Sequence, residues 1–159
     1  MAFYTGVGSL VQIGKEAQFG KGVSPTALVD ITSESLKIAV EKGDEGSLLA
    51  SKTQTRRDLL GVTVDGSVSF ILKPEFAGLL LHAALGGVDT CTQIESSEKW
   101  QHTIALCEAA EPLPSLTVIV HRRAATKAYA GCTIASLSLE CAAGDYVKGS
   151  MDLRGVKEE

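Results

Sequence analysis

The chain has 159 residues, which is enough for one domain with a real core and too little for two comfortable ones. Hydrophobic residues make up 45% of the sequence and aromatic residues only 5%, so Val, Leu, Ile and Ala must fill that core. The formal net charge of −4 argues against tight binding of duplex DNA, which requires clustered Lys and Arg. We expect no membrane helix, because no apolar stretch approaches the roughly 20 residues that one needs. We also expect no signal peptide, because no basic region precedes an apolar run at the N-terminus.

The first third of the chain predicts a short arm followed by strands. Residues 1–8 are mixed in character and punctuated by glycine, which is typical of an extended arm. Residues 14–26 contain several glycines and one proline and predict a turn-rich connection. Apolar residues and, in the last run, two-residue alternation predict strands over 9–13, 27–31 and 36–40.

Residues 42–61 carry both signs of charge, two pairs of leucines and no sustained period. Loops of this length in a compact domain are usually functional or disordered. Because the flanking strands are expected to pair, this segment would form the tip of a long hairpin. Two interpretations are open: a solvated loop, or an assembly loop that docks on a neighbouring subunit. The candidate contact residues under the second interpretation are Leu48, Leu49, Arg56, Arg57, Leu59 and Leu60.

The most informative stretch is 62–87, where an alternating strand runs directly into a short apolar helix. One face of the strand is apolar and the other is polar, which predicts a half-buried antiparallel strand over 62–72. Pro74 at the first helical position and Glu75 in the first turn start a helix over 74–86. The glycine pair after Leu85 provides its C-terminal cap.

The second half of the chain predicts further strands separated by loops. Residues 88–99 are polar and 121–130 are mixed, so we expect a loop or irregular edge at the first and a loop at the second. The clearest pair is a hairpin near the C-terminus, with one buried and one solvated face around the turn at 142–145. The strands predicted in this half are 100–106, 116–120, 135–141 and 147–154.

Six or more strands and one helix predict a mainly β fold, either a β-sandwich or a partly open barrel of antiparallel strands with one flanking α-helix. We expect a single β domain over 9–156, with the arm 1–8 outside it. The sheet of such a domain has exposed strand edges, and exposed edges tend to pair with other chains unless they are blocked.

Candidate chemistry is sparse, and we expect no catalytic residue, no metal site and no cofactor. None of the three histidines stands at metal-ligand spacing from a second histidine, a cysteine or a carboxylate. No serine lies in a nucleophile elbow, and no glycine loop opens a helix toward phosphate. The four cysteines lack metal or redox spacing, and Cys132 and Cys141 are expected as small buried hydrophobes. The basic cluster around Arg122 and Lys127 favours an ion-pair patch at a subunit contact over a nucleic-acid site.

The stretch GVTVDGSVSFILKPEFAGLLLHAALGG resembles the central signature of phage tail tube (major tail) proteins, in which a strand leads through a Pro-Glu pair into a Leu/Ala helix that ends in glycine. Upstream, VQIGKEAQFGKGVSPTALVDITSESLKI is similar to the N-terminal pattern of that family. Downstream, CTIASLSLECAAGDYVKGSMDLRG is similar to its closing hairpin. The upstream similarity rests on Glu16, Gly20, Pro25, Ile31, Ser33, Glu34 and Ser35.

This resemblance implies a structural virion protein whose rings stack into a tail tube, a conduit for DNA that is assembled in the bacterial host cytoplasm. The strands 36–40 and 62–72 would line the inner barrel, while the arm and the 42–61 segment would contact the next ring. Six copies per ring are expected for a single-barrel protein, and three if the chain is the front half of a two-barrel protein. Other tail proteins would be its partners, and DNA would pass without specific binding. The alternatives are the inner tube of a contractile tail or tailocin, and a small ligand-binding β domain.

Overall fold

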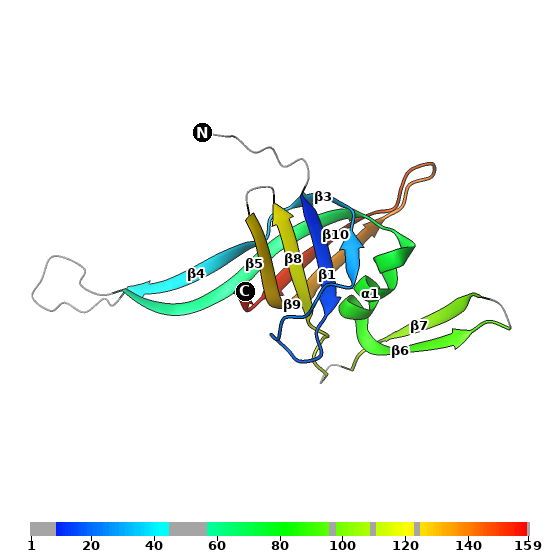
Figure 1. Ribbon diagram of the computed structural model, residues 1–159, viewed down its shortest axis with the longest axis horizontal. Coiled ribbons are helices and arrows are strands. Elements are labelled where there is room, and N and C mark those ends of the chain that lie inside the picture. Colours follow the sequence, from blue (N-terminus) through cyan, green and yellow to red (C-terminus); the bar gives the residue numbers. More distant parts are fainter. Residues whose placement is uncertain (1–8, 45–56, 96–97, 109–110, 123–124, 159) are drawn as a thin grey trace, which may run out of the picture.

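The computed structural model describes residues 9–44, 57–95, 98–108, 111–122 and 125–158. Within them, nine strands form one curled antiparallel sheet, two more form a separate ribbon, and one helix lies between the two (Figure 1). The elements are β1 (Leu10–Lys15), β2 (Ala27–Val29), β3 (Ile31–Glu34), β4 (Lys37–Asp44), β5 (Arg57–Ile71), α1 (Pro74–Leu85), β6 (Gly86–Gln93), β7 (Trp100–Leu106), β8 (Leu116–Arg122), β9 (Ala125–Glu140), β10 (Lys148–Gly155) and β11 (Lys157–Glu158).

The sheet curls because β9 belongs to both of its halves. Residues 125–132 of β9 pair with β8, and residues 133–140 pair with β10. The strand order is β2-β1-β8-β9-β10-β5-β3, with β4 continuing beside β5 after β3. Register shifts occur on both sides of the middle of β9, and Gly131 there has a positive φ of 68°. Bulges of this kind increase the local twist and bend a strand, which folds one half of the sheet over the other.

The core lies between the two halves. The alternation predicted for 62–72 is confirmed from Val64 onward, because Val64, Val68 and Phe70 are buried, whereas Val62 on the same face is exposed. Gly66 interrupts the apolar face for a steric reason: a Cβ added there would lie 2.7 Å from the Cα of Leu36. The other fully buried large side chains include Ile13, Leu36, Leu116, Tyr129, Met151 and Leu153.

The predicted helix is confirmed and ends at Leu85, with Gly86 as its left-handed C-cap. The N–H of Gly86 donates to the carbonyl of His82, as such caps commonly do. The helix buries Phe76, Leu80 and Ala83 on the core side, and the Phe76 ring meets Phe70 edge to face at 5.9 Å between centroids. This helix therefore covers the apolar side of the sheet near β2 and β9 (Figure 1).

Two loop predictions are wrong. Residues 86–93 form β6 and pair with β7, and the expected loop at 121–130 is occupied by the end of β8 and the start of β9. The β6–β7 ribbon leaves the body, so its strands do not need the apolar alternation that marks a strand covering a core. The start of β9 pairs with β8 at the sheet surface through Thr126 and Lys127. The sequence there is therefore mixed and lacks the alternation from which a strand is predicted.

The boundaries of the 42–61 segment also differ from the prediction. β4 continues through Asp44 and β5 already begins at Arg57, so both ends of the expected loop are paired strand. The remainder, like the arm 1–8, lies outside the described residues.

Candidate assembly surfaces

One end of the main sheet has an open edge at residues 133–140 of β9. On one side of β9, the pairing with β8 stops at the Leu116–Cys132 pair. On the other side, β10 pairs with the whole of this stretch, from Thr133 to Glu140. Among the described residues, no strand covers the β8 side beyond Cys132. Unpaired backbone groups along such an edge can hydrogen-bond to a strand of another chain.

An apolar groove lies beside this open edge, between helix α1 and β9. It has a volume of about 410 Å³. Leucine side chains from both elements line it, together with Ile134, and Leu139 at the rim is 43% exposed. The groove therefore offers apolar surface next to unpaired backbone. Its lining residues are Leu81, Ala84, Leu85, Ile134, Ala135, Ser136, Leu137 and Leu139.

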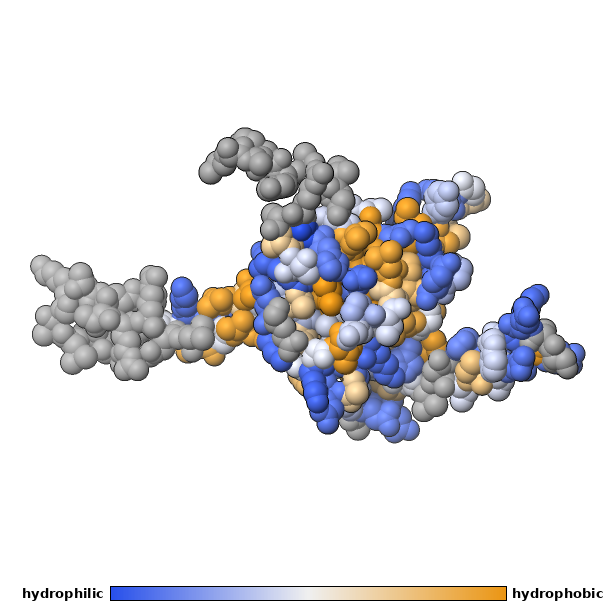
Figure 2. Space-filling model, in the orientation of Figure 1, coloured by the Kyte–Doolittle hydropathy of each residue, from blue (hydrophilic) through white to orange (hydrophobic). Residues whose placement is uncertain are grey.

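The other end of the main sheet extends into a two-stranded ribbon, formed by β4 and residues 57–63 of β5 and named here the β4–β5 ribbon (Figure 1). Val40 and Val62 are directly paired across it, and both are exposed, at 48% and 38%. Leu60 is 71% exposed, but it lies at the register shift of β5, and its side chain approaches Gly43 on the opposite face of the ribbon. Figure 2 shows the resulting hydrophobic surface where the ribbon leaves the body. Val40 and Val62 form an apolar stripe that continues the core face of the sheet into solvent.

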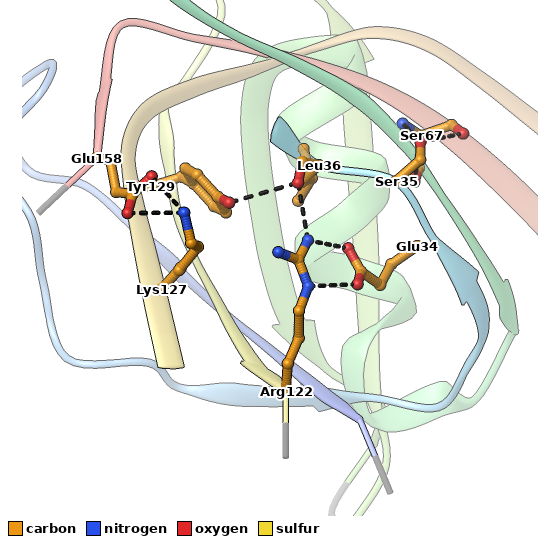
Figure 3. Close-up of polar contacts among 8 residues, drawn as sticks. All are labelled: Glu34, Ser35, Leu36, Ser67, Arg122, Lys127, Tyr129 and Glu158. Carbon is orange, nitrogen blue, oxygen red and sulfur yellow. Dashed lines mark hydrogen bonds and ion pairs between the residues drawn. The ribbon is translucent and has the colours of Figure 1, made fainter. Parts of the chain in front are cut away.

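The root of the β4–β5 ribbon is fixed by polar contacts at Leu36, between β3 and β4 (Figure 3). Arg122 of β8 donates two hydrogen bonds of 2.7 Å to the carboxylate of Glu34 and a third, of 2.8 Å, to the carbonyl of Leu36. The hydroxyl of Tyr129 donates to the same carbonyl at 3.4 Å. Hydrogen bonding by Arg122, despite opposing partial burial, lowers the pKa of Glu34 below its ordinary value. These contacts tie the two halves of the sheet together.

The basic cluster forms ion pairs within the chain. Arg122 pairs with Glu34, and Lys127 pairs with Glu158 at 3.1 Å, so both cations have partners within the chain. β3 and β11 bring these acids to the two cations, and a subunit contact at this cluster stays a prediction.

Glu16 fixes the connection between β1 and β2 as a nearly buried carboxylate. It accepts hydrogen bonds from the hydroxyls of Ser115 and Thr117 and from the backbone N–H groups of Gly20 and Gly131. Burial by itself would raise the pKa of Glu16, but these four hydrogen bonds outweigh it and lower the pKa. The glutamate singled out by the sequence resemblance thus holds a loop to the sheet.

The outer face of the four-stranded part of the sheet, made of the start of β4, residues 63–71 of β5, β10 and residues 133–140 of β9, is polar. Hydroxyls form cross-strand hydrogen bonds on it, with 2.8 Å between the oxygens of Ser138 and Ser150 and 3.1 Å between those of Ser35 and Ser67. Ser136 donates to Asp152 at 2.6 Å. We call this surface the hydroxyl face. It lies on the side of the sheet away from the core.

The contact residues predicted from the sequence are only partly within the described chain. Leu48, Leu49 and Arg56 lie outside it. Arg57, Leu59 and Leu60 lie in β5, and Leu60 is exposed on the face opposite the apolar stripe. Val40 and Val62 were missed as contact candidates because their alternation was assigned to the core. The length of the hairpin could have identified them, because the hairpin extends beyond the body of the sheet and keeps the same alternation there.

The cysteines and histidines form no metal site among the described residues. Cys132 is buried as predicted, and burial, helped by the charge of Glu16, raises the pKa of its thiol to about 12. The prediction for Cys141 is wrong: it follows the last residue of β9 and is exposed. No helix of the described chain has both the length and the apolar character to span a bilayer.

Comparison with known proteins assigns the sequence to a family and finds similar folds among solved structures. The sequence matches the phage tail tube protein family over residues 6–159. No curated protein matches it significantly. Among solved structures, a chain in the tail of an empty GTA particle, refined with C6 symmetry, is 14% identical, with 94% of this chain and 93% of that chain covered and a TM-score of 0.55.

Two further structures have similar folds. A chain of the SPP1 tail tube is 11% identical, with 94% of this chain and 74% of that chain covered and a TM-score of 0.50. A chain from the sheath/tube terminator of the extracellular contractile injection system PVC is also 11% identical, with 99% and 96% covered and a TM-score of 0.53.

This mainly β fold with one flanking helix is thus shared with chains of phage-like tails and of an injection system. The chain belongs to the phage tail tube protein family, and its role is that of a structural protein of the virion tail.

Proposed function

We propose that identical copies of this chain join edge to edge into rings, and that the rings stack into the tail tube through which DNA leaves the particle. The observation that carries the proposal is the pair of complementary sheet ends. The edge at 133–140 of β9 lies beside an apolar groove, and the opposite end of the sheet carries an apolar stripe into solvent.

The strand directions support continuous pairing between copies. Across the four-stranded part, β9, β10, β5 and the β3–β4 side alternate in direction, since every neighbouring pair is antiparallel. An even number of alternating strands means that β9 of one copy meets the β3–β4 edge of the next in antiparallel orientation. Rotation about one axis then repeats the contact until the barrel closes, which leaves no lateral edge.

In this arrangement the apolar stripe of one copy enters the groove beside α1 of the next. The hydroxyl face lines the pore, and the helix lies on the outer side. The arm 1–8 and the 42–61 segment, with Leu48, Leu49, Arg56, Arg57, Leu59 and Leu60 as candidate contacts, reach the neighbouring ring. We place assembly in the bacterial host cytoplasm, with other tail proteins at the ends of the tube and no catalytic step.

Six copies per ring is the stoichiometry we propose, and the C6 symmetry of the GTA tail supports it by analogy of fold. A longer two-barrel protein would instead form rings of three. The similarity to a chain of a contractile injection system supports the second candidate, an inner tube surrounded by a sheath. The hydroxyl face and the two sheet ends serve either kind of tube.

Size-exclusion chromatography with light scattering, followed by negative-stain microscopy, tests the proposal. We expect rings or filaments whose abundance rises with protein concentration. Leu139→Lys, at the rim of the groove, should abolish them. Leu28→Lys is the matched control, because Leu28 is 48% exposed on β2, away from the proposed contact. A monomer at all concentrations would contradict the proposal and favour a small ligand-binding domain. Equal assembly of the two variants would contradict the placement of the contact.

A further inference from the structure

Charges on the hydroxyl face stand opposite one another in the strand register. Asp65 of β5 is directly paired with Lys37 of β4 on one side and with Arg154 of β10 on the other. At the far end of the face, Glu140 is directly paired with Lys148. Directly opposed residues of antiparallel strands have Cβ atoms only about 4.5–5.5 Å apart, so opposite charges there attract.

The remaining acid of the face, Asp152, lies between Arg154 and Ser150 along β10. It is directly paired with Ser67 of β5 and with Ser136 of β9, whose hydroxyl donates to it. The basic residues of this surface are Lys37, Lys148 and Arg154, and its acidic residues are Asp65, Glu140 and Asp152. The surface is therefore polar and rich in charge, yet each cation has an acid as its cross-strand or same-strand neighbour.

This pattern matters for a polyanion. Duplex DNA binds a protein mainly by exchanging condensed counterions for Lys and Arg, so each cation free to meet a phosphate adds to both the affinity and its salt dependence. A cation held beside a carboxylate contributes little, because the phosphate must compete with that carboxylate. Most of the serine hydroxyls between the charges already have partners: Ser138 bonds to Ser150, Ser35 to Ser67, and Ser136 to Asp152.

We propose that Asp65 and Asp152 keep the hydroxyl face from binding duplex DNA by compensating Lys37 and Arg154. This inference rests on the proposed function, in which that face lines the pore. DNA then passes a surface that neither attracts it strongly nor repels it, although basic side chains project from that surface.

The double variant Asp65→Asn/Asp152→Asn removes both acids and keeps side-chain oxygens that can accept from Thr63 and Ser136. Binding of a short labelled DNA duplex is measured by fluorescence anisotropy on the full chain below its assembly concentration, where the face is open. We expect no detectable binding by the parent protein and clear binding by the variant at low salt. Releasing two cations predicts a loss of affinity of about tenfold between about 50 and 200 mM salt.

The matched control is Glu98→Gln/Glu111→Gln, which changes the net charge equally at exposed positions outside the hydroxyl face. It should leave DNA binding undetectable. Strong binding by the parent protein, or equal binding by the two double variants, would overturn the inference. A map of assembled tubes with another surface lining the pore would instead overturn the proposed placement, while the anisotropy result would stand as a property of the face.

Discussion

The two ribbons that leave the body of this protein are both two-stranded and differ in how they are joined to it (Figure 1). The β4–β5 ribbon is an extension of the main sheet, and its apolar stripe continues the core face. The β6–β7 ribbon, Gly86–Gln93 with Trp100–Leu106, forms a sheet of its own and follows helix α1 through the Gly86 cap. Isolated two-stranded hairpins are at best marginally stable in water, so each ribbon depends on what supports it.

Support differs at the two roots. The first ribbon is held by Arg122, Glu34 and Tyr129 around Leu36, and by the close approach of Gly66 to that residue. The second is held where Gly87 passes the carbonyl of Ala105, and where the N–H of Cys107 donates to Leu85 at 2.9 Å. The roots therefore differ in kind: side chains of β8 and β9 hold the first ribbon to the main sheet, and backbone contacts hold the second to the end of helix α1.

The largest effect is expected from placing charge on the apolar stripe. Val40→Asp/Val62→Asp puts two carboxylates on a directly opposed pair, and burying them in a neighbouring copy would cost several kcal/mol. Assembly should be lost while the circular dichroism of the monomer is unchanged. The matched control is Thr92→Asp/Gln101→Asp, which charges a directly opposed exposed pair of the β6–β7 ribbon and should still assemble. Loss of assembly in both would remove the distinction between the ribbons.

A smaller effect is expected from filling the glycine positions at the two roots. A Cβ at Gly66 would lie 2.7 Å from backbone atoms of Ser35 and Leu36, and one at Gly87 would lie 2.2 Å from the carbonyl oxygen of Ala105. Overpacking of this kind costs about 1–3 kcal/mol. Gly66→Ala should lower the melting temperature of the domain by about 2–4 °C per kcal/mol lost.

Gly87→Ala strains a contact between β6 and β7 only, so it should open that ribbon with little change in the global melting temperature. Hydrogen exchange resolved by peptide separates the two results. Equal global destabilisation by both variants would contradict the idea that the β6–β7 ribbon is an independent unit.

The ion pair at the first root predicts a dependence of stability on pH. Because Arg122 lowers the pKa of folded Glu34, the unfolded state binds the proton more readily, and stability falls as pH falls through the folded pKa. At pH 7 Glu34 is ionised and accepts both hydrogen bonds from Arg122. Glu34→Gln should therefore lower the free energy of unfolding by about 1–3 kcal/mol at this pH. The difference from the parent protein should shrink as pH falls from the ordinary pKa of glutamate to the lowered pKa of folded Glu34. Urea unfolding at several pH values measures it, and a constant difference would contradict the assignment.

The sequence correctly predicts the elements that cover the core, and its predictions are wrong for segments that do not cover the core. The β5 strand, the helix and the C-terminal hairpin are confirmed because burial imposes a period of two or a capped apolar helix on their residues. The sequence predicts a loop in place of β6 because residues 90–93 are exposed on both faces and no period marks them. The ion pairs of Arg122 and Lys127 could not be predicted, since their partners, Glu34 and Glu158, are 88 and 31 residues away in sequence. Whether Val40 and Val62 are buried in the core or exposed for contact depends on where the body of the sheet ends. Two-residue alternation does not locate that point.

The smallest effect is expected from Tyr129→Phe, which removes only the hydroxyl that donates to Leu36 at the root of the β4–β5 ribbon. That hydrogen bond is long, at 3.4 Å, and the carbonyl keeps its shorter bond from Arg122, so no buried acceptor loses its last partner. The ring stays in the core with its packing intact. We therefore expect a loss of at most about 1 kcal/mol in urea unfolding and unchanged assembly. A loss as large as that of Glu34→Gln would mean that the tyrosine, and not the arginine, fixes the ribbon to the body.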